Sequence, residues 1–315
     1  MVALSPGGST RINPLDDGPG TAGEAEERRT LRRAGMVAAL AATVLDRPLS
    51  PIEDAAVFAT VEHLGRGRGP ATLTDLAGLL VEVPPQVAEA LRRSSAELAG
   101  ELGPLGYAID KLVSRSLRGM FDGASTVALR WDGPGIVVDL SAVPIDSEAL
   151  PLVMVAVAGW LSQLMAGEGP QRVQVIDEAW ALLGNRHTAR YLQTCFKLGR
   201  SYGVANLCIA HRPSDLGAQA DDGTATAKIA AGLLADSATK ILLRQAPDQL
   251  ATATTSFGLT GPEAHIVGQL ARGRALWKVA GRSAVVQHML GEAEVAMCDT
   301  DAKMAARQAE QAEAA

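Results

Sequence analysis

The feature that most constrains this chain is an apolar run that ends in two adjacent carboxylates. Residues 172–176 read Arg-Val-Gln-Val-Ile, Asp177 and Glu178 follow, and a helical pattern begins at Ala179. A central strand of a parallel sheet is buried on both faces and reads as a nearly continuous hydrophobic run. Ligands lie at the carboxyl ends of such strands. We therefore expect a strand buried on both faces, with both acids at its ligand-facing end.

Two neighbouring carboxylates in this position are suited to phosphate hydrolysis. Asp177 would hold a Mg²⁺ ion, directly or through water, and Glu178 would polarise a water for attack on a phosphate. This is the Walker B arrangement of a P-loop ATPase. The alternative is structural, because acids at a solvated strand end also favour the first turn of the following helix.

Composition restricts the class of protein. The chain has 315 residues, 47% of them hydrophobic, which is enough for one large or two modest domains. Its net charge of −6 excludes a global basic surface for nucleic acid, although a local basic stripe stays open. The cysteines Cys195, Cys208 and Cys298 lack metal-type spacing and are expected to be reduced thiols, with Cys208 a small core residue in a strand.

The N-terminus carries no signal-peptide pattern. One apolar stretch, residues 149–166, approaches the length of a membrane span but contains Pro151 and Gly159 and directly precedes the acidic strand. We interpret it as a buried helix against the sheet, with a transmembrane span as the alternative.

Residues 21–112 are expected to be helical. Ser50-Pro51 and Thr72 are typical helix starts, because a hydroxyl residue caps the first turn and proline fits the first helical position. Pro85 predicts the first turn of another helix, which we expect to run to Gly100. From residue 126 to 244, strand and helix patterns alternate, which favours a parallel α/β sheet. The predicted strands are 126–131, 135–140, 172–176, 204–210 and 239–244, followed by a terminal hairpin at 274–289 and an uninformative tail beyond Gly291.

Several sequence blocks occur in a recognisable order. They are Val-Ile-Asp-Glu-Ala-Trp-Ala-Leu-Leu at 175–183, Gly-Arg-Ser-Tyr-Gly at 199–203, and Ile-Ala-His-Arg-Pro-Ser-Asp-Leu at 209–216, preceded by Asn-Pro-Leu-Asp at 13–16. Together they resemble the FtsK–HerA superfamily of RecA-like motor ATPases, and most of all the conjugative-transfer and type IV secretion ATPases. The resemblance extends from residue 1 to about residue 290.

The resemblance implies ATP and Mg²⁺ as cofactors. It makes Asp177 the Mg²⁺-associated acid and Glu178 the general base. His211 occupies the place of a glutamine that in the family contacts the γ-phosphate or the attacking water, and the charge of its imidazole depends on pH. Arg212 follows this residue, as in the HerA-like branch, and is expected to help bind the nucleotide.

Basic residues provide candidates for an arginine finger. Arg200 matches a family arginine often placed at a subunit interface, where a guanidinium would reach a neighbour's nucleotide. The alternative for Arg200 is a structural role at a helix C-terminus. Arg244, ending a predicted strand at the same sheet edge, is a second candidate, and Arg272, Arg274 and Lys278 are weaker ones.

One family motif is absent. No GxxxxGK[ST] sequence occurs, and the glycine-rich pieces at 65–69 and 103–106 lack both its spacing and its lysine. This motif supplies the backbone cradle and the lysine for the β- and γ-phosphates. We expect the chain to be the C-terminal part of a longer ATPase whose N-terminal half holds the P-loop, with a degenerate paralogue as the alternative.

The fold implied by the resemblance is a RecA-like α/β core with a mostly parallel sheet, a helical insertion and a C-terminal β-hairpin, without the first strand and the P-loop. The expected boundaries are residues 1–20 for the start of the core, 21–112 for the helical insertion, 113–290 for the core with the Walker B and sensor strands, and 291–315 for a flexible tail.

The function implied is that of a motor that hydrolyses ATP in a ring, expected to be a hexamer. It would drive DNA or protein transfer together with conjugation or secretion machinery at the cytoplasmic face of the cell membrane. The alternatives are a HerA- or FtsK-like translocase acting on duplex DNA, a catalytically silent subunit that uses the ATPase fold for interactions, and an unrelated α/β binding module. Whether this chain alone is an enzyme stays open, because the P-loop is absent.

Overall fold

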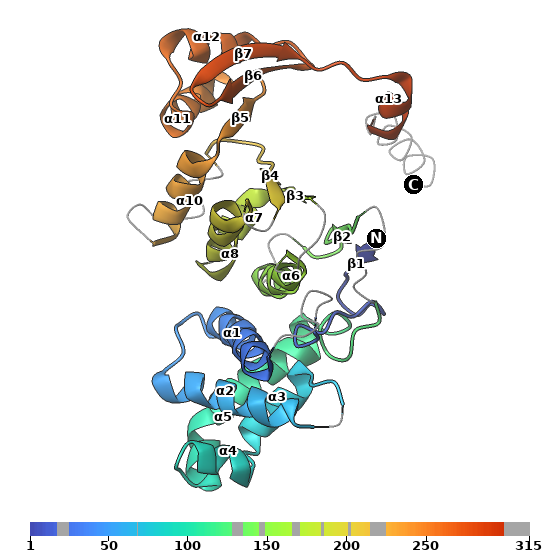
Figure 1. The fold of residues 1–315 in the computed structure, drawn as a ribbon, viewed down its shortest axis with the longest axis vertical. Coiled ribbons are helices and arrows are strands. Elements are labelled where there is room, and N and C mark those ends of the chain that lie inside the picture. Colours follow the sequence, from blue (N-terminus) through green and yellow to red (C-terminus); the bar gives the residue numbers. More distant parts are fainter. Residues whose placement is uncertain are drawn as a thin grey trace, which may run out of the picture. The chain divides into compact units, whose positions relative to one another are not determined.

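A computed structural model describes residues 1–17, 25–67, 69–127, 135–144, 149–165, 171–183, 186–200, 203–214 and 225–298. The chain divides into two compact units. The first consists of Met1–His211 and Asp215–Asp236, and the second of Arg212–Ser214 and Ser237–Ala315. Figure 1 labels their helices and strands. The domain boundaries expected from the sequence stay predictions.

The first unit contains a bundle of helices that follows a short strand. Figure 1 shows these helices together, in blue to blue-green. They are α1 (Glu26–Val44), α2 (Pro51–Gly65), α3 (Leu73–Val81), α4 (Pro85–Ala90) and α5 (Ser95–Lys111), which continues as a π-helical turn at Leu112–Ser116. The predicted starts at Ser50 and Thr72 are confirmed, because each hydroxyl accepts a hydrogen bond from the third helical backbone N–H in a capping box.

The prediction of one helix from Pro85 to Gly100 is wrong. Helix α4 ends at Ala90, and Arg92 adopts a left-handed conformation with φ of +54°. Ser94 then caps α5 and forms a capping box with Glu97. A serine that can bond to the backbone competes with helix continuation, so Ser94 starts a new helix instead of lying within the previous one.

The interior of the bundle is apolar and fully enclosed. Leu76, Leu80, Leu98 and Leu102 are completely buried and belong to the largest hydrophobic cluster of the molecule. Glu53 is a buried charge in this region, and Arg47 donates two hydrogen bonds of 2.7 Å to its carboxylate. These bonds, with those from Ser50, lower the pKa of Glu53 to about 2.

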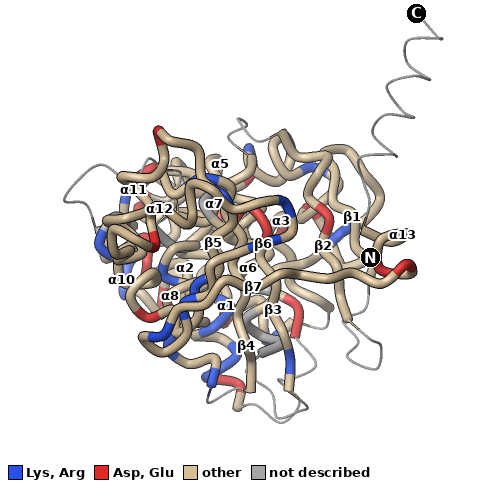
Figure 2. Tube along the Cα trace, turned by 90° about the horizontal axis from the view of Figure 1, so that it is seen from above, with Lys and Arg blue, Asp and Glu red and all other residues tan. Residues whose placement is uncertain are grey.

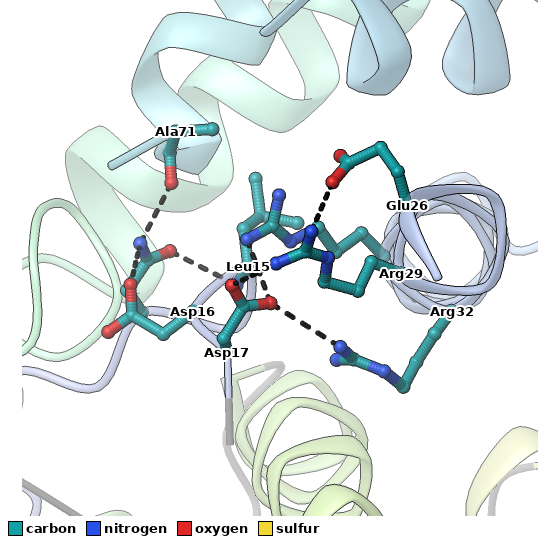
Figure 3. A network of polar contacts seen from close by, with 9 residues as sticks. Leu15, Asp16, Asp17, Glu26, Arg29, Arg32 and Ala71 are labelled. Carbon is teal, nitrogen blue, oxygen red and sulfur yellow. Dashed lines mark hydrogen bonds and ion pairs between the residues drawn. The ribbon is translucent and has the colours of Figure 1, made fainter. Parts of the chain in front are cut away.

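The segment before α1 is anchored by a buried asparagine. Asn13 Nδ2 donates to Asp16 Oδ1 at 2.7 Å and to the carbonyl of Ala71 at 2.8 Å, while its Oδ1 accepts from the backbone N–H of Leu15. Figure 3 draws this network. The Asn-Pro-Leu-Asp block is therefore fixed to the segment that directly precedes α3.

A second contact fixes the same segment to α1. Asp17 accepts a hydrogen bond of 3.0 Å from Arg33 and lies 3.5 Å from guanidinium nitrogens of Arg29 and Arg32 (Figure 3). These arginines are spaced i, i+3 and i+4, so they lie on one face of α1. One carboxylate thereby joins the loop to three side chains of the helix.

The strands of the first unit form two small parallel sheets. Strand β1 (Val2–Ala3) pairs with β2 (Val138–Asp139), and β3 (Arg172–Ile176) pairs with β4 (Val204–Cys208). The unit also contains α6 (Ala149–Met165), α7 (Ala179–Leu183), α8 (Arg186–Leu198) and α10 (Ala225–Asp236). Of the predicted strand at 126–131, residues 126 and 127 are not a strand and the rest lies outside the described residues.

Helix α6 is the apolar stretch that approached membrane-span length. Val153 and Ala156 are completely buried, and the helix packs mainly against α1 and α8. The prediction of a buried helix is confirmed, although its main neighbours are helices rather than the sheet. Among the described residues, no helix combines the length and the apolar character needed to cross a membrane.

The β3–β4 sheet is covered on one face. On that face Gln174 Nε2 donates to the hydroxyl of Tyr191 and Asn206 Nδ2 donates to the carbonyl of Cys195, both at 2.7 Å, so the sheet faces helix α8. Burial raises the pKa of the Cys195 thiol to about 11.

The opposite face of β3–β4 is apolar and exposed. Val173 and Val175 are 70% and 56% exposed, and Leu207 and Ile209 of the neighbouring strand are exposed as well. The prediction of strands buried on both faces is therefore wrong for the described residues. Cys208 is also exposed, and not the small core residue that the sequence suggested. A strand's own sequence does not reveal how many layers cover it.

The second unit is built on an antiparallel sheet. Strand β5 (Thr239–Leu242) pairs with β6 (Arg274–Val279), and β6 pairs with β7 (Arg282–Gln287). The predicted hairpin is confirmed, with Ala280 and Gly281 in the left-handed conformations of its turn. Strand β5 is antiparallel to its neighbour, which corrects the expectation that it extends a parallel sheet.

Helices α11 (Pro247–Phe257) and α12 (Gly261–Gln269) belong to the second unit, and α13 (Glu292–Cys298) follows the hairpin (Figure 1). No residue within α13 is buried, which agrees with the absence of a core pattern beyond Gly291. Glu263 accepts hydrogen bonds from Ser283, from the Thr260 backbone and from Lys278 Nζ at 2.9 Å, which lower its pKa to about 2. Lys278, a weak arginine-finger candidate, thus contributes to this local network.

Candidate functional site

At the end of β3 the backbone bulges, so that Asp177 and Glu178 lie between two residues that both bond to Ile209. The Ile209 N–H donates to the carbonyl of Ile176 at 2.9 Å, and the Ile209 carbonyl accepts from the N–H of Ala179 at 3.0 Å. Residues 176 and 179 therefore both pair with one residue just beyond β4. Asp177 and Glu178 are left outside this ladder, at the carboxyl end of the strand where the sequence placed them.

Glu178 has an unusual backbone conformation. Its φ is +53°, in the left-handed region that residues with a side chain rarely occupy. Its N–H donates to Asp177 Oδ1 at 3.0 Å, which supports the turn. Non-glycine residues held in this region cost about 1–3 kcal/mol and are concentrated at functional sites.

The bulge brings Glu178 to His211. Glu178 Oε1 and His211 Nε2 are 2.7 Å apart, although the residues are 33 positions apart in the sequence. Both side chains stay in contact with solvent, so the pair is accessible to a ligand. The structure thus joins two of the residues that the sequence singled out, the expected general base and the expected sensor.

The donor set near this pair is small. Among the residues that the structure describes, no group of three or more His, Cys, Asp or Glu side chains could hold a metal ion by itself. Mg²⁺ in nucleotide sites is held by one or two carboxylates together with phosphate oxygens and waters. Asp177 fits that requirement as a single protein ligand, or as an acceptor for a metal-bound water.

Arg200 follows α8 in a segment with strict packing. A Cβ on Gly199 would lie 2.6 Å from the Cys195 carbonyl and 2.7 Å from Asn206 Nδ2, so only glycine fits there. Gly203 has φ of +65°. The glycines of the Gly-Arg-Ser-Tyr-Gly block therefore serve the turn from α8 into β4, and Arg200 is exposed on that turn. No contact in the described part of the chain joins Arg200 to Glu178 or His211.

Arg212 and Arg244 belong to the second unit. Near Arg212, the pKa of Asp248 is lowered, mainly by a hydrogen bond from Gln249 and to a smaller extent by the arginine. Strand β5 ends at Leu242, so Arg244 lies beyond the strand and not at its last position as expected. Figure 2 shows basic and acidic positions interspersed along the trace.

Two features of the site were missed in the sequence. The first is the left-handed conformation of Glu178, for which no local signal exists because neither glycine nor asparagine marks it. The second is the exposed apolar face, which the alternation at 172–176 does signal. Polar Gln174 and Asn206 face α8, whereas Val173 and Val175 face solvent. In a sheet with one face in solvent, apolar residues are expected to face the core and polar residues the solvent, so the alternation here is reversed.

The comparisons with known proteins concern the fold of the chain. Neither a family model nor a curated protein matches the chain. Solved structures do match, and the fold they share with this chain is the RecA-like fold of P-loop ATPases.

The similar structures include VirB4 and the bacterial conjugative coupling protein TrwB. VirB4 of Thermoanaerobacter pseudethanolicus aligns with a TM-score of 0.70 and 19% identity over 93% of this chain and 78% of its own. The bacterial conjugative coupling protein TrwB aligns with a TM-score of 0.52 and 16% identity, over 92% of this chain and 78% of its own. TrwB has also been solved with the GTP analogue GDPNP, and with ADP and Mg²⁺.

Proposed function

We propose that this chain supplies the water-activating side of an ATPase site in a motor for conjugation or type IV secretion. The observation that carries the proposal is the 2.7 Å contact between Glu178 and His211 at the end of β3, next to Asp177. The nucleotide and Mg²⁺ complexes of TrwB, which has a similar fold, support ATP and Mg²⁺ as the ligands.

Each residue of the site has a defined role in this proposal. Asp177 holds Mg²⁺, which neutralises charge on the phosphates when bound. Glu178 accepts the proton of the attacking water, because its carboxylate is exposed and is oriented by His211. His211 donates a hydrogen bond to the carboxylate or to the γ-phosphate, and Arg212 helps to bind the nucleotide.

The phosphate cradle comes from polypeptide other than these residues, since GxxxxGK[ST] is absent from the sequence. The exposed apolar face of β3–β4 supports this part of the proposal. Val173 and Val175 lie on one side of β3, because side chains alternate with a period of two, and Asp177 follows directly after the end of this strand. A segment that covered this face would therefore end beside the acids. We assign that segment to the N-terminal half of the ATPase.

The assembly proposed is a ring, a hexamer, at the cytoplasmic face of the cell membrane. It would act with conjugation or secretion machinery to move DNA or protein. Arg200 is the first candidate for an arginine finger from a neighbouring subunit, because it is exposed on the turn between α8 and β4. Arg244 is the second candidate, as an exposed residue after β5.

The first test is to read the genomic DNA in frame upstream of the Met1 codon. An open frame that encodes a strand, GxxxxGK[ST] and a helix supports the proposal. The polypeptide encoded by that frame is then assayed for Mg²⁺-dependent ATP hydrolysis. Glu178→Gln should lower the rate about 10²–10⁴-fold, as expected for the loss of a general base.

The matched control is Glu27→Gln, which removes an exposed carboxylate in the first turn of α1 and should leave the rate unchanged. Hydrolysis that persists in Glu178→Gln would overturn the assignment of the general base. If no P-loop is encoded and no ATP is hydrolysed, the second candidate function holds. It is a catalytically silent interaction subunit, which the absence of GxxxxGK[ST] favours.

A further inference from the structure

The helical bundle of the first unit carries a groove that the proposed ATPase site does not use. It has a volume of about 790 Å³ and is formed by helices α2, α3 and α5. Its apolar lining includes Leu64 of α2, Ala77 and Val81 of α3, and Tyr107 of α5. A volume of this size is within the range of ligand-binding clefts in proteins.

The groove follows from small residues where α3 and α5 cross. A Cβ on Gly106 would lie 2.7 Å from Val81 Cγ2 and 3.1 Å from the carbonyl of Ala77, so the two helices approach closely only because this position is glycine. Gly78 lines the groove from α3, and a Cβ there would meet no atom within 4 Å. The close crossing and the missing side chain leave a depression in the bundle surface.

Tyr107 stands beside this depression with most of its surface in solvent. It is 65% exposed, although it belongs to a helix whose other large apolar residues are buried. Aromatic residues of this kind contribute strongly to protein interfaces, because they bury a large area at a small cost in conformational entropy.

The titratable side chains in the described lining of the groove are nearly all acidic. Asp75, Glu82 and Asp110 line it, and His63 is the one residue among its described lining that can carry a positive charge. A polyanion such as nucleic acid would be repelled by these carboxylates. A segment with lysines or arginines would be attracted, and its apolar side chains could pack on Tyr107 and Val81.

We propose that this groove docks a basic amphipathic segment of a partner protein. The leucine-sized side chains of the segment occupy the depression over Gly78 and against Tyr107. Its cationic side chains pair with Glu82 and Asp110 at the rim, while Asp75 also caps α3 through its bonds to Thr72. The inference does not depend on ATP hydrolysis, because no residue of the groove belongs to the β3–β4 edge.

The test uses a fluorescent model peptide of about 15 residues, roughly four helical turns, with leucines on one face and lysines on the other. A matched peptide carries glutamate in place of each lysine. Fluorescence anisotropy with the whole chain should detect binding of the lysine peptide and none of the glutamate peptide. Equal binding of the two peptides would overturn the proposal.

Two kinds of variant locate the binding. Glu82→Lys with Asp110→Lys reverses the rim charge, and the matched control Glu27→Lys with Glu89→Lys makes the same change in net charge at exposed positions outside the groove. The groove variant should weaken binding at least about tenfold more than the control. Equal weakening by both would mean that only the overall charge attracts the peptide.

Gly78→Phe tests the depression without a change in charge. The new side chain has open space and replaces a helix-destabilising glycine, so the bundle should stay folded. Binding should fall at least about tenfold, because the ring occupies the site of the peptide's apolar side chains. Unchanged affinity in Gly78→Phe, with the melting temperature of the wild type, would contradict docking in this groove.

Discussion

The helical bundle and the β3–β4 edge of the first unit differ in how far their apolar and charged side chains are buried. In the bundle, leucines such as Leu98 and Leu102 are completely buried, and the buried carboxylate of Glu53 has a bidentate partner. At the β3–β4 edge, Val173 and Val175 are exposed, and Glu178 has a strained backbone in contact with solvent.

Within the first unit, the bundle therefore contributes mainly to stability, whereas the β3–β4 edge carries the candidate site. The core of the bundle is enclosed by residues of the chain itself, including residues of α6, so the burial of its leucines does not depend on a partner. The β3–β4 edge leaves apolar area uncovered, and it holds its acids where a ligand can reach them. Sites of function are commonly the least stable parts of a structure, because binding requires unsatisfied groups.

The largest expected effect is on the bundle core. Leu102→Ala should lower the free energy of unfolding by about 2–5 kcal/mol, because a fully buried leucine leaves a cavity. Val175→Ala on the exposed face should cost less than about 1 kcal/mol. Urea unfolding at pH 7 measures both. Equal losses would mean that the apolar face of β3–β4 is covered in the folded protein.

Next in size is the buried asparagine. Asn13→Ala removes hydrogen bonds to Asp16, to Ala71 and to the Leu15 N–H, and should lower the free energy of unfolding by about 1–3 kcal/mol. His211→Ala removes a solvent-exposed contact and should cost less than about 1 kcal/mol. Urea unfolding measures the free energy of unfolding of both variants. A larger loss of stability in His211→Ala than in Asn13→Ala would contradict the expected order.

The buried acid gives a pH-dependent effect. The pKa of Glu53 is about 2 in the folded protein, mainly through Arg47, and is lower than in an unfolded chain. Its stabilisation is therefore complete above about pH 4.5 and is lost as the pH falls towards 2. Glu53→Gln should cost about 1–3 kcal/mol at pH 7 and less at pH 3. Thermal unfolding at both values checks this, and a cost at pH 3 that equals the cost at pH 7 would contradict it.

The smallest expected effect has the opposite sign. Glu178→Gly should leave the free energy of unfolding unchanged or raise it by up to about 1 kcal/mol, because glycine adopts φ of +53° without strain. The control Glu62→Gly, within helix α2, should lower it by about 1 kcal/mol. A loss in Glu178→Gly as large as that of the control would mean that the turn is not strained.

Local signals in the sequence were sufficient for elements that depend on local chemistry. The caps at Ser50 and Thr72, the hairpin at Gly281 and the position of Asp177 and Glu178 at a strand end were predicted because neighbouring residues determine them. The break at Arg92 was not predicted, although Ser94 followed three residues later by Glu97 is a local signal for the start of a new helix.

Features that depend on distant segments were not predictable from one stretch. Val173 and Val175 have the composition of a buried strand, but their exposure depends on whether another layer covers that face. The contact of His211 with Glu178 was not predicted, because the resemblance gave each residue a separate role, and its geometry follows from the pairing of β3 with β4. The roles of Asp177, Glu178, His211, Arg200, Arg212 and Arg244 stay predictions.

Because the backbone of Ile209 is bonded to both Ile176 and Ala179, the exchange of its amide proton reports on the opening of the end of β3. That N–H is bonded at 2.9 Å although its own side chain is exposed, so it exchanges with solvent deuterium only when the end of β3 opens. Its exchange rate is therefore a local measure of how long Asp177 and Glu178 are held in position. It can be followed in the protein alone, without nucleotide or partner.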